Sequence, residues 1–361
     1  MKKIGRGIVN DSINDSIKVR DQSVTSYFRS FFRGALIVAA LAIPATSRAA
    51  SVVLTAGDAL GATSFNAAGN WSPAGAPSAG NTYSTLGFLL RSPTGAGNYT
   101  FAGDSLTVGG GNGGGANPFS PVSANNDCFI AKIGSASTFS ANWILDGAQI
   151  RDGLGNGDSY TIGGTIAVTA NGGSFVCQAT QNVSAAISGS SIVYIGDHGA
   201  GANSARVVVF QSAANTFNGN VELTNTANNA TQSLLTLAPG SLWNFKPQAN
   251  GVNNSIFGTG SILLGGNLAI DLTGADNTLG DTWQLVAPTS ASFIPTYGGT
   301  FAVNGFTQNA TLWDASANGT TYEFSQATGL LTVVPEPATM SLIGMGLGFG
   351  ALLLRRKHSR A

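Results

Sequence analysis

One histidine, His198, lies in the central part of the chain, directly after Asp197 in a glycine-rich stretch. An Asp–His pair can activate a serine nucleophile only when the fold brings all three groups together. A zinc site needs three or four converging ligands, and one histidine with two distant cysteines does not supply them. A solvated turn is the simpler interpretation of Asp197–His198. The sequence therefore predicts no metal centre and no enzyme.

Carboxylates are the other groups that could do chemistry. Of the thirteen acids between residues 50 and 334, only Glu222 and Glu323 are glutamates, and no spacing sets a converging pair for sugar hydrolysis. Residues 153–160 match the calcium-binding nonapeptide G-G-x-G-x-D-x-U-x in part and in a single copy. Asp152 and Asp158 would be its oxygen ligands. We expect no cofactor, with calcium at these two aspartates as the alternative.

Cys128 and Cys177 are the only cysteines of the chain. If the chain is exported, an oxidising compartment would favour a disulfide between them. Closing a loop of about 50 residues would stabilise the fold by roughly 4 kcal/mol in the loop-entropy model. Two buried thiols are the alternative, because Phe175–Gln178 reads as a strand that would place Cys177 in a core.

The formal net charge of zero is the sum of three unlike segments. Residues 1–49 carry eight Lys/Arg and three Asp/Glu, residues 50–334 carry five and thirteen, and residues 335–361 carry four and one. Charged residues are 9% of the 361, against roughly 25% in ordinary soluble domains. So few basic residues in the central segment exclude a nucleic-acid partner.

The N-terminal segment has the features of a secretory signal peptide. A basic stretch ends at Arg33, the apolar run 34–44 follows, and Ser47-Arg48-Ala49 places small residues at −3 and −1 of a cut after Ala49. The run is shorter than a spanning helix needs. We therefore expect cleavage after Ala49 and export of the remainder.

The C-terminal segment has three parts in a fixed order. Pro335-Glu336-Pro337 is followed by seventeen uncharged residues, 338–354, and then by the basic cluster Arg355-Arg356-Lys357. Seventeen helical residues cover about 25 Å, the lower limit for crossing a membrane. The basic cluster would stop transfer and stay cytoplasmic. The two prolines would keep Glu336 in an extended, accessible segment.

This order of parts resembles the PEP-CTERM sorting signal of Gram-negative bacteria, also called the ice-binding protein C-terminal domain. The resemblance implies that exosortase, a membrane cysteine protease, recognises the tail and that the passenger reaches the cell surface or the extracellular matrix. It covers about 27 of the 361 residues. It implies no activity for the passenger.

The central segment is predicted to be all-β. Short β-branched or aromatic runs closed by Gly, Asn or Asp recur at spacings of roughly 10–25 residues. Two architectures remain open: an irregular parallel β-solenoid, favoured by near-equal strands and abundant Asn, and a β-sandwich or jelly roll. The runs are 51–54, 160–162, 165–169, 191–195, 206–210, 219–224, 233–237 and 268–272, followed by 280–286, 299–303, 321–324 and 329–334.

Two stretches at the ends of this segment differ from the rest. Residues 64–83, with Asn70-Trp71 followed by Pro73, resemble the opening of β-strand-repeat regions in autotransporter-like surface proteins. Near the other end, five aromatics are interpreted as the core of a terminal cap rather than a sugar-binding platform. They are Trp283, Phe301, Trp313, Tyr322 and Phe324.

The sequence thus predicts four parts: an N-terminal extension with signal peptide (1–49), a β-rich passenger (50–264), a β-rich cap region (265–334) and the sorting signal (335–361). The expected function is that of a structural or adhesive protein of the cell surface or matrix, held in the membrane by its C-terminal helix until processing. The alternative is a secreted carbohydrate-active protein, a polysaccharide lyase or a carbohydrate-binding module on a β-helix. Extracellular polysaccharide is one candidate partner of the passenger.

Overall fold

The computed structural model describes residues 49–110, 128–131, 136–152, 159–177, 179–197, 207–224, 233–286 and 293–336. All of them belong to one compact unit, Ser47–Ala361. Their regular structure consists of 28 β-strands and a single 3-10 turn, η1 (Leu272–Gly274). The prediction of an all-β fold is confirmed; the expected transmembrane segment, 338–354, lies outside the described residues.

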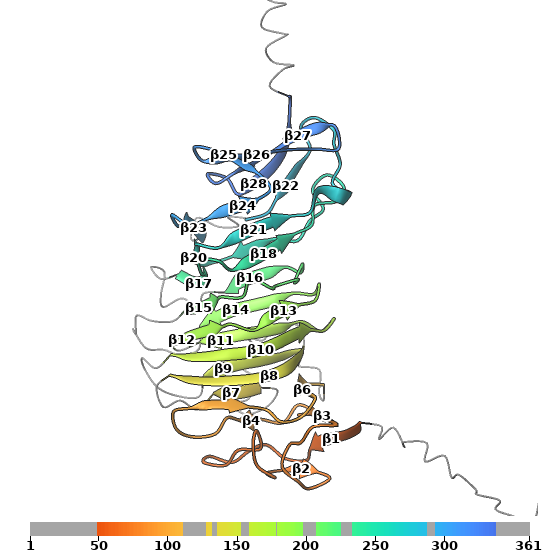
Figure 1. The fold of residues 1–361 in the computed structure, drawn as a ribbon, viewed down its shortest axis with the longest axis vertical. Helices are drawn as coiled ribbons and strands as arrows, with labels where there is room; N and C mark the ends of the chain where they lie inside the picture. Colours follow the sequence, from red (N-terminus) through yellow and green to blue (C-terminus); the bar gives the residue numbers. More distant parts are fainter. Residues whose placement is uncertain are drawn as a thin grey trace, which may run out of the picture. The chain divides into compact units, whose positions relative to one another are not determined.

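Three parallel sheets account for most strands (Figure 1). In the first, all pairs are parallel except the one between β1 and β2. Its members are β1 (Ala50–Leu54), β2 (Trp71–Ser72), β3 (Asn81–Ser84), β5 (Asn98–Thr100), β6 (Ser105–Gly109), β8 (Ser137–Asp146), β10 (Tyr160–Val168), β12 (Thr180–Val183), β13 (Ala186–Ser188), β15 (Val207–Phe210), β17 (Ser233–Leu237), β20 (Gly260–Leu264) and β23 (Phe293–Tyr297).

The second sheet contains β4 (Leu90–Arg91), β7 (Cys128–Ala131), β9 (Ala148–Asp152), β11 (Gly173–Cys177), β14 (Val193–Asp197), β16 (Val221–Thr224) and β19 (Ile256–Gly258). The third contains β18 (Leu242–Phe245), β21 (Asn267–Ile270) and β24 (Ala302–Asn304). A fourth, antiparallel sheet is formed by β22 (Thr282–Gln284), β25 (Thr307–Asn309), β26 (Leu312–Ala317), β27 (Thr320–Ser325) and β28 (Leu330–Val334).

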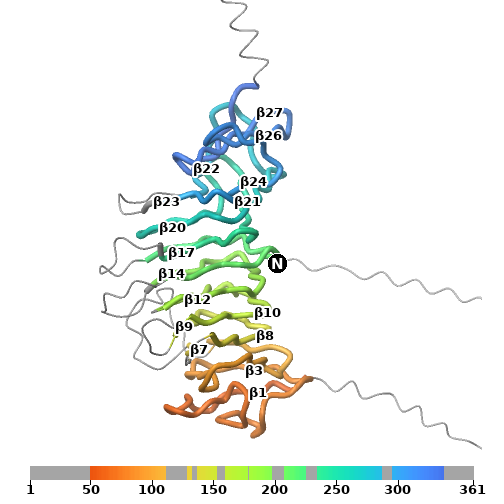
Figure 2. Tube along the Cα trace, turned by 60° about the vertical axis from the view of Figure 1, so that its left-hand side comes forward, coloured from red at the N-terminus to blue at the C-terminus, as the bar shows by residue number. Residues whose placement is uncertain are grey.

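Strand partners in the parallel sheets follow chain order (Figure 2). The chain thus comes back to the same sheet one strand spacing further along each time, and we call each such passage a return. The return distance varies: Gly173 pairs with Val193, 20 residues on, whereas Val221 pairs with Ile256, 35 residues on. Neighbouring strands in a sheet lie about 4.8 Å apart. An irregular return distance explains why the sequence displays no strict repeat.

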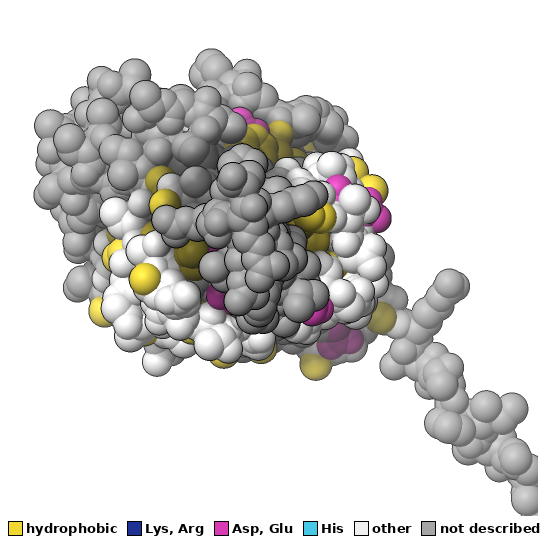
Figure 3. All heavy atoms as spheres, turned by 90° about the horizontal axis from the view of Figure 1, so that it is seen from above, with side chains coloured by type: hydrophobic (Ala, Val, Ile, Leu, Met, Phe, Trp, Pro, Cys, Tyr) yellow, Lys and Arg dark blue, Asp and Glu magenta, His cyan; other side chains and the backbone are white. Residues whose placement is uncertain are grey.

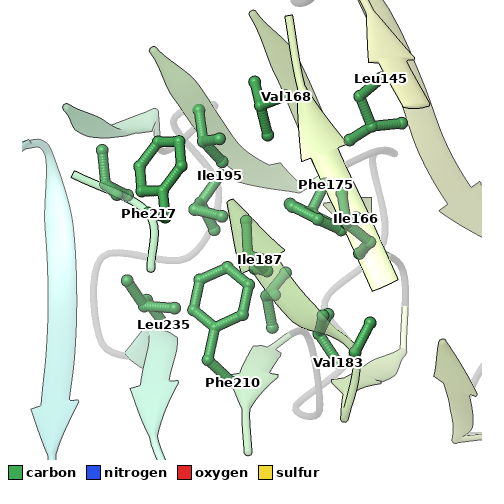
Figure 4. Packing of buried hydrophobic residues seen from close by; sticks show 14 of the residues in the cluster. Leu145, Ile166, Val168, Phe175, Val183, Ile187, Ile195, Phe210, Phe217 and Leu235 are labelled. Carbon is green, nitrogen blue, oxygen red and sulfur yellow. The ribbon is translucent and has the colours of Figure 1, made fainter. Parts of the chain in front are cut away.

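Alternation along each strand directs one set of side chains inward. In β8, Phe139, Ala141, Trp143 and Leu145 are buried, whereas the residues between them are partly or fully exposed. Figure 4 shows such residues from successive strands gathered in one core. Phe210 is in register with Val183, and its ring packs edge-on against that of Phe175. One continuous hydrophobic cluster therefore runs from Val52 to Val333.

Two predicted strands, 160–162 and 165–169, prove to be one strand, β10. The intervening Gly164 has φ +88°, and a Cβ there would collide with the carbonyl oxygen of Ala141. Glycine thus allows a left-handed residue within β10 while the strand stays paired with β8 along its length. The predicted strand 268–272 ends earlier, at Ile270, because Asp271 caps η1 by accepting from the Thr273 backbone N–H.

Asparagine side chains connect one return of the chain to the next. Asn215 is buried; its Oδ1 accepts from the Ile187 N–H (2.9 Å), and its Nδ2 donates to the Leu242 carbonyl (2.9 Å). Asn254 donates to the Gly219 carbonyl, 35 residues earlier (3.2 Å), and to the Asn244 carbonyl (2.9 Å). These asparagines thus act through amide hydrogen bonds rather than through a left-handed backbone, since Asn318 alone among the described asparagines has a positive φ.

The N-terminal end is closed by the segment containing Asn70 and Trp71. Buried Asp58 accepts from the Ser64 N–H (2.8 Å) and the Arg91 N–H (2.9 Å). The Trp71 indole N–H donates to the Ser64 carbonyl (2.6 Å), and its ring packs on Tyr83. This stretch, which sequence reasoning noticed through its tryptophan, is thus a terminal cap organised by a carboxylate that sequence reasoning missed.

Candidate functional site: the C-terminal junction

The last strand, β28, lies inside the antiparallel sheet rather than at its edge. The strand order is β22-β28-β27-β26-β25. β28 pairs with β27 through Phe324↔Leu331 and Tyr322↔Val333, and with β22 through Trp283↔Leu331. Leu331 and Val333 are fully buried. The β-branched and leucine residues of Leu330–Val334 thus fill a position that needs inward apolar side chains and pairing on both edges.

The C-terminal end of β28 is held on both sides. Thr321 pairs with Val334 on the β27 side. On the other side, the Gly280 N–H donates to the Val333 carbonyl (3.0 Å), and the Val333 N–H donates to the Asp281 carbonyl (2.9 Å). The chain leaves this arrangement at Pro335, which has no N–H to continue the ladder. Pro335 and Glu336 are both exposed.

The remaining tail residues of interest, Pro337 and Arg355-Arg356-Lys357, lie outside the described residues. Ala49, where the signal peptide is expected to end, is exposed and directly precedes β1. The predicted cut after Ala49 would thus leave β1 intact.

The five aromatics of the predicted cap are buried, which confirms their interpretation as core. Trp283, Tyr322 and Phe324 are inaccessible to solvent, and Trp313 and Phe301 are 5% and 7% exposed. Phe301 packs edge-on against Trp313, with ring centroids 5.6 Å apart. The Trp283 indole N–H donates to the Ala249 carbonyl (3.0 Å). None of these five rings is available as a flat surface for a sugar.

The charged side chains of the cap region all carry the same sign. Residues 265–334 contain five acids, Asp271, Asp276, Asp281, Asp314 and Glu323, and no Lys or Arg. In Figure 3, which looks onto the C-terminal end, acidic side chains lie on several sides of the exit of the chain. Asp314 and Glu323 are directly paired across β26 and β27. Burial, and then the neighbouring Asp314 carboxylate, raise the pKa of Glu323.

Asp271 shows the opposite behaviour. Hydrogen bonds from the side chain and then the backbone of Thr273 lower the pKa of Asp271. The hydroxyl and the N–H of Thr273 both donate to its Oδ1, at 2.6 and 3.1 Å. The difference follows from the surroundings: donors stabilise the carboxylate of Asp271, whereas burial and a facing acid disfavour that of Glu323.

The predicted disulfide between Cys128 and Cys177 is wrong. Both residues are buried thiols. Cys128 packs with Leu89 and Ile130 in a small separate cluster, whereas Cys177 belongs to the main core. β9 separates their strands, and Cys128 is in register with Gln149 whereas Val176 is in register with Arg151. Disulfides need Cα atoms less than about 7 Å apart, so the alternative of two separate thiols is correct.

Asp152, one of the two aspartates considered for calcium, has a structural role. It is buried, and its Oδ2 accepts from the Ala179 N–H (2.9 Å). Burial, and then the charge of Asp152, raise the pKa of the buried Tyr160 well above its usual range. Asp158 and His198 lie outside the described residues. Within the described ranges no three His, Cys, Asp or Glu side chains come together as a metal site would require.

The two glutamates considered for sugar hydrolysis lie in different sheets. Glu222 belongs to β16 and pairs with Tyr194 of β14, whereas Glu323 belongs to β27 of the antiparallel sheet. Burial, and then the Glu222 carboxylate, raise the pKa of Tyr194. The structure therefore does not bring these glutamates together as an acid/base pair.

Comparison with protein families identifies the tail. Residues 333–357 match the family described as the PEP-CTERM protein-sorting motif. The chain therefore carries a PEP-CTERM sorting motif, which implies export and processing by exosortase in a membrane-associated step. No curated protein and no solved structure matches the chain. No helix in the described part of the chain is long and apolar enough to span a membrane.

The match begins at Val333, two residues before the exposed prolyl segment. The sorting motif thus overlaps the folded sheet: its first two residues, Val333 and Val334, are the last two of β28. Sequence reasoning placed the motif correctly but could not show this overlap. The pairing that produces it joins Leu331 to Trp283, 48 residues away.

Proposed function

We propose that this protein is an exported structural or adhesive component of the cell surface or extracellular matrix, delivered through its PEP-CTERM signal. The observation that carries the proposal is the junction itself. The sorting motif begins in the last strand of a closed, packed sheet, and its Pro335-Glu336 is exposed at the point where the chain leaves the fold. Such an arrangement presents a recognition segment without unfolding the passenger.

The precursor spans the membrane once through residues 338–354 in this proposal. The apolar length of about 25 Å and the following Arg355-Arg356-Lys357 support a stop-transfer segment with a cytoplasmic end. The N-terminal run 34–44 and Ala49 support a cleaved signal peptide. Export then leaves residues 50–334 outside the membrane, with five Lys/Arg and thirteen Asp/Glu.

The passenger is proposed to be an irregular parallel β-solenoid. Support comes from strand pairing that follows chain order in parallel sheets. The inward-facing side chains of successive strands also form one continuous core, and a cap closes each end. A β-sandwich would instead pair its strands mainly antiparallel. Terminal caps protect the open edges of such a stack from adding further chains.

A structural or adhesive role is supported by one row of outward-facing residues on the first sheet, which we call the outward rank. The rank follows one register position through eight strands, and six of its eight side chains carry a hydroxyl or an amide. None is charged. Its members are Asn98, Thr138, Thr161, Asn182, Val209, Thr236, Leu263 and Thr296. A hydrated, uncharged rank suits passive contact with water and neutral polymers.

The sorting part of the proposal is tested by replacing Pro335-Glu336-Pro337 with three alanines in the full chain. We expect this variant to accumulate at precursor mass in the membrane fraction. Deleting residues 335–361 should instead abolish membrane retention. Wild-type processing and location in both variants would contradict the proposal.

The same outward rank favours a second candidate, a carbohydrate-binding module. Hydroxyl and amide groups repeat along it at the strand spacing of about 4.8 Å, a regular array of donors and acceptors for a neutral glycan. Purified passenger should be incubated with the host's extracellular polysaccharide, with and without calcium. No retention supports the structural role, retention without shortening supports the binding module, and chain shortening supports an enzyme.

A further inference from the structure

The end of β28 has no unpaired backbone edge. Tyr322 and Thr321 of β27 pair with Val333 and Val334 on one side. The Gly280 N–H and the Asp281 carbonyl bond the backbone of Val333 on the other. The side chains of Leu331 and Val333 lie in the core. Every residue of the motif that precedes Pro335 is therefore held by the fold.

Enzymes and binding domains that recognise extended peptides commonly do so through backbone hydrogen bonds at a strand edge. A strand that is paired on both edges cannot offer such bonds. Binding of Val333 or Val334 in an enzyme cleft would first require β28 to detach and would expose Leu331 and Val333. The first residue available without such opening is Pro335, where the ladder ends.

The distance to the apolar segment is also short. Three residues separate Val334 from Ala338. The four residue steps between them cover at most about 14 Å in an extended chain. The rim of the cap beside the exit, where Leu279 is 64% exposed next to Gly280, must therefore lie close to any enzyme that reads this segment. β28 extends to Val334, so no spacer separates the folded sheet from Pro335.

We propose that the cap sheet confines processing to the peptide bonds after Pro335 and that access at its rim limits the rate of processing. This inference rests on the proposed function, since it presupposes that the tail is cut. The step breaks one peptide C–N bond. With water as co-reactant, the carbonyl carbon gains a hydroxyl and the departing nitrogen gains a proton. The released passenger keeps β28 and hence its complete cap.

The position is tested by intact-mass measurement of the passenger recovered from cells that contain the processing enzyme. We expect a C-terminal residue at Pro335 or later. A C-terminus at or before Val334 would overturn the inference while leaving the sorting function in place. A passenger that always retains Ala361 would overturn the proposed function and the inference together.

Access is tested by inserting a Gly-Gly-Ser-Gly-Gly-Ser linker between Val334 and Pro335. We expect the half-life of the precursor to shorten severalfold in a pulse-chase experiment. The matched control carries the same linker after Gly319, in the turn between β26 and β27, and should be processed at the wild-type rate. Equal half-lives for the linker variant and the wild type would show that the rim does not limit access.

A second variant keeps the test independent of the linker. Val333→Gly removes a buried side chain at the end of β28 and should weaken its attachment without touching Pro335-Glu336-Pro337. We expect a minor product cut upstream of Val334 to appear in its mass spectrum. A single product identical to that of the wild type, from a variant whose β28 amides exchange faster with deuterium, would contradict the proposal.

Discussion

The parallel sheets and the antiparallel C-terminal sheet bury similar residues by different means. In the parallel sheets each strand contacts the return before and the return after it, and buried amides such as Asn215 connect the returns. In the antiparallel sheet, short hairpins bring β26, β27 and β28 together locally, and large aromatics fill the space beneath them. The first arrangement can be extended indefinitely, whereas the second ends the stack and releases the chain at Pro335.

The largest expected effect distinguishes the cores of these two regions. Trp283→Ala in the antiparallel sheet and Trp243→Ala in β18 each remove a buried indole, which costs about 3–5 kcal/mol. Hydrogen exchange should then differ: the first variant should expose the amides of β27 and β28, and the second those of β15 and β18, where Trp243 packs on Phe210. Identical exchange patterns would show that the two regions open as one unit.

Loss of an amide connection should have a smaller effect. Asn215→Ala leaves the Ile187 N–H and the Leu242 carbonyl without these partners inside the fold, which should cost about 1–3 kcal/mol of unfolding free energy. Asn304→Ala, at an exposed position of β24, is the matched control and should change little. Denaturant unfolding measures both. If Asn215→Ala lost as little unfolding free energy as the control, these amide hydrogen bonds would not stabilise the contacts between returns.

At the N-terminal end, Asp58→Asn should cost about 1–2 kcal/mol. The amide oxygen could keep the two N–H donors that now share Oδ2, but the NH₂ group would face the Ser64 hydroxyl and the Asn70 side-chain N–H, which now donate to Oδ1. Asp104→Asn is the control, because Asp104 is exposed and accepts one bond, from the Gly80 N–H (2.8 Å). Thermal unfolding of the two variants gives the comparison. An equal shift in both would show that Asp58 does not organise the N-terminal cap.

The smallest effects concern pH within the acidic cap region. The raised pKa of Glu323 means that its ionised form destabilises the fold, and this contribution disappears as pH falls through the folded-state pKa. The lowered pKa of Asp271 means the opposite: its stabilisation is present above the unfolded-state pKa and is lost as pH falls through the folded-state pKa. At neutral pH, Glu323→Gln should thus stabilise slightly and Asp271→Asn destabilise slightly.

Melting temperatures of these two variants and the wild type between pH 3 and 7 measure the difference. The two curves should approach the wild-type curve at the acid end of the range, from opposite sides. Shifts of the same sign at neutral pH would contradict the assignment of donors to Asp271 and of a like charge to Glu323.

The sequence predicted the fold class and many strands because β-branched runs between turn residues carry a local signal. Runs such as Ser233–Leu237 became strands with the predicted bounds. The partners of these strands could not be predicted, since return distances vary from 20 to 40 residues and fix no period. The longest strand, Ser137–Asp146, was missed although its buried Phe139, Ala141, Trp143 and Leu145 alternate regularly.

The junction was predictable as a motif but not as a structure. Pro335-Glu336-Pro337 can be recognised from the local sequence, because an apolar segment and then a basic cluster follow it directly. That β28 is paired on both edges depends on Gly280 and Asp281, some fifty residues earlier in the chain. The disulfide failed for a related reason: spacing in the sequence does not reveal that Cys128 and Cys177 belong to different clusters.

The central claim is that the C-terminal signal delivers a folded passenger to the cell surface. The most direct measurement follows the wild-type chain in matched cells with and without exosortase, by fractionation and intact mass. The account predicts a shortened, folded passenger at the surface or in the matrix when the enzyme is present, and a full-length precursor in the membrane fraction when it is absent. The same mass and the same location in both cells would contradict it.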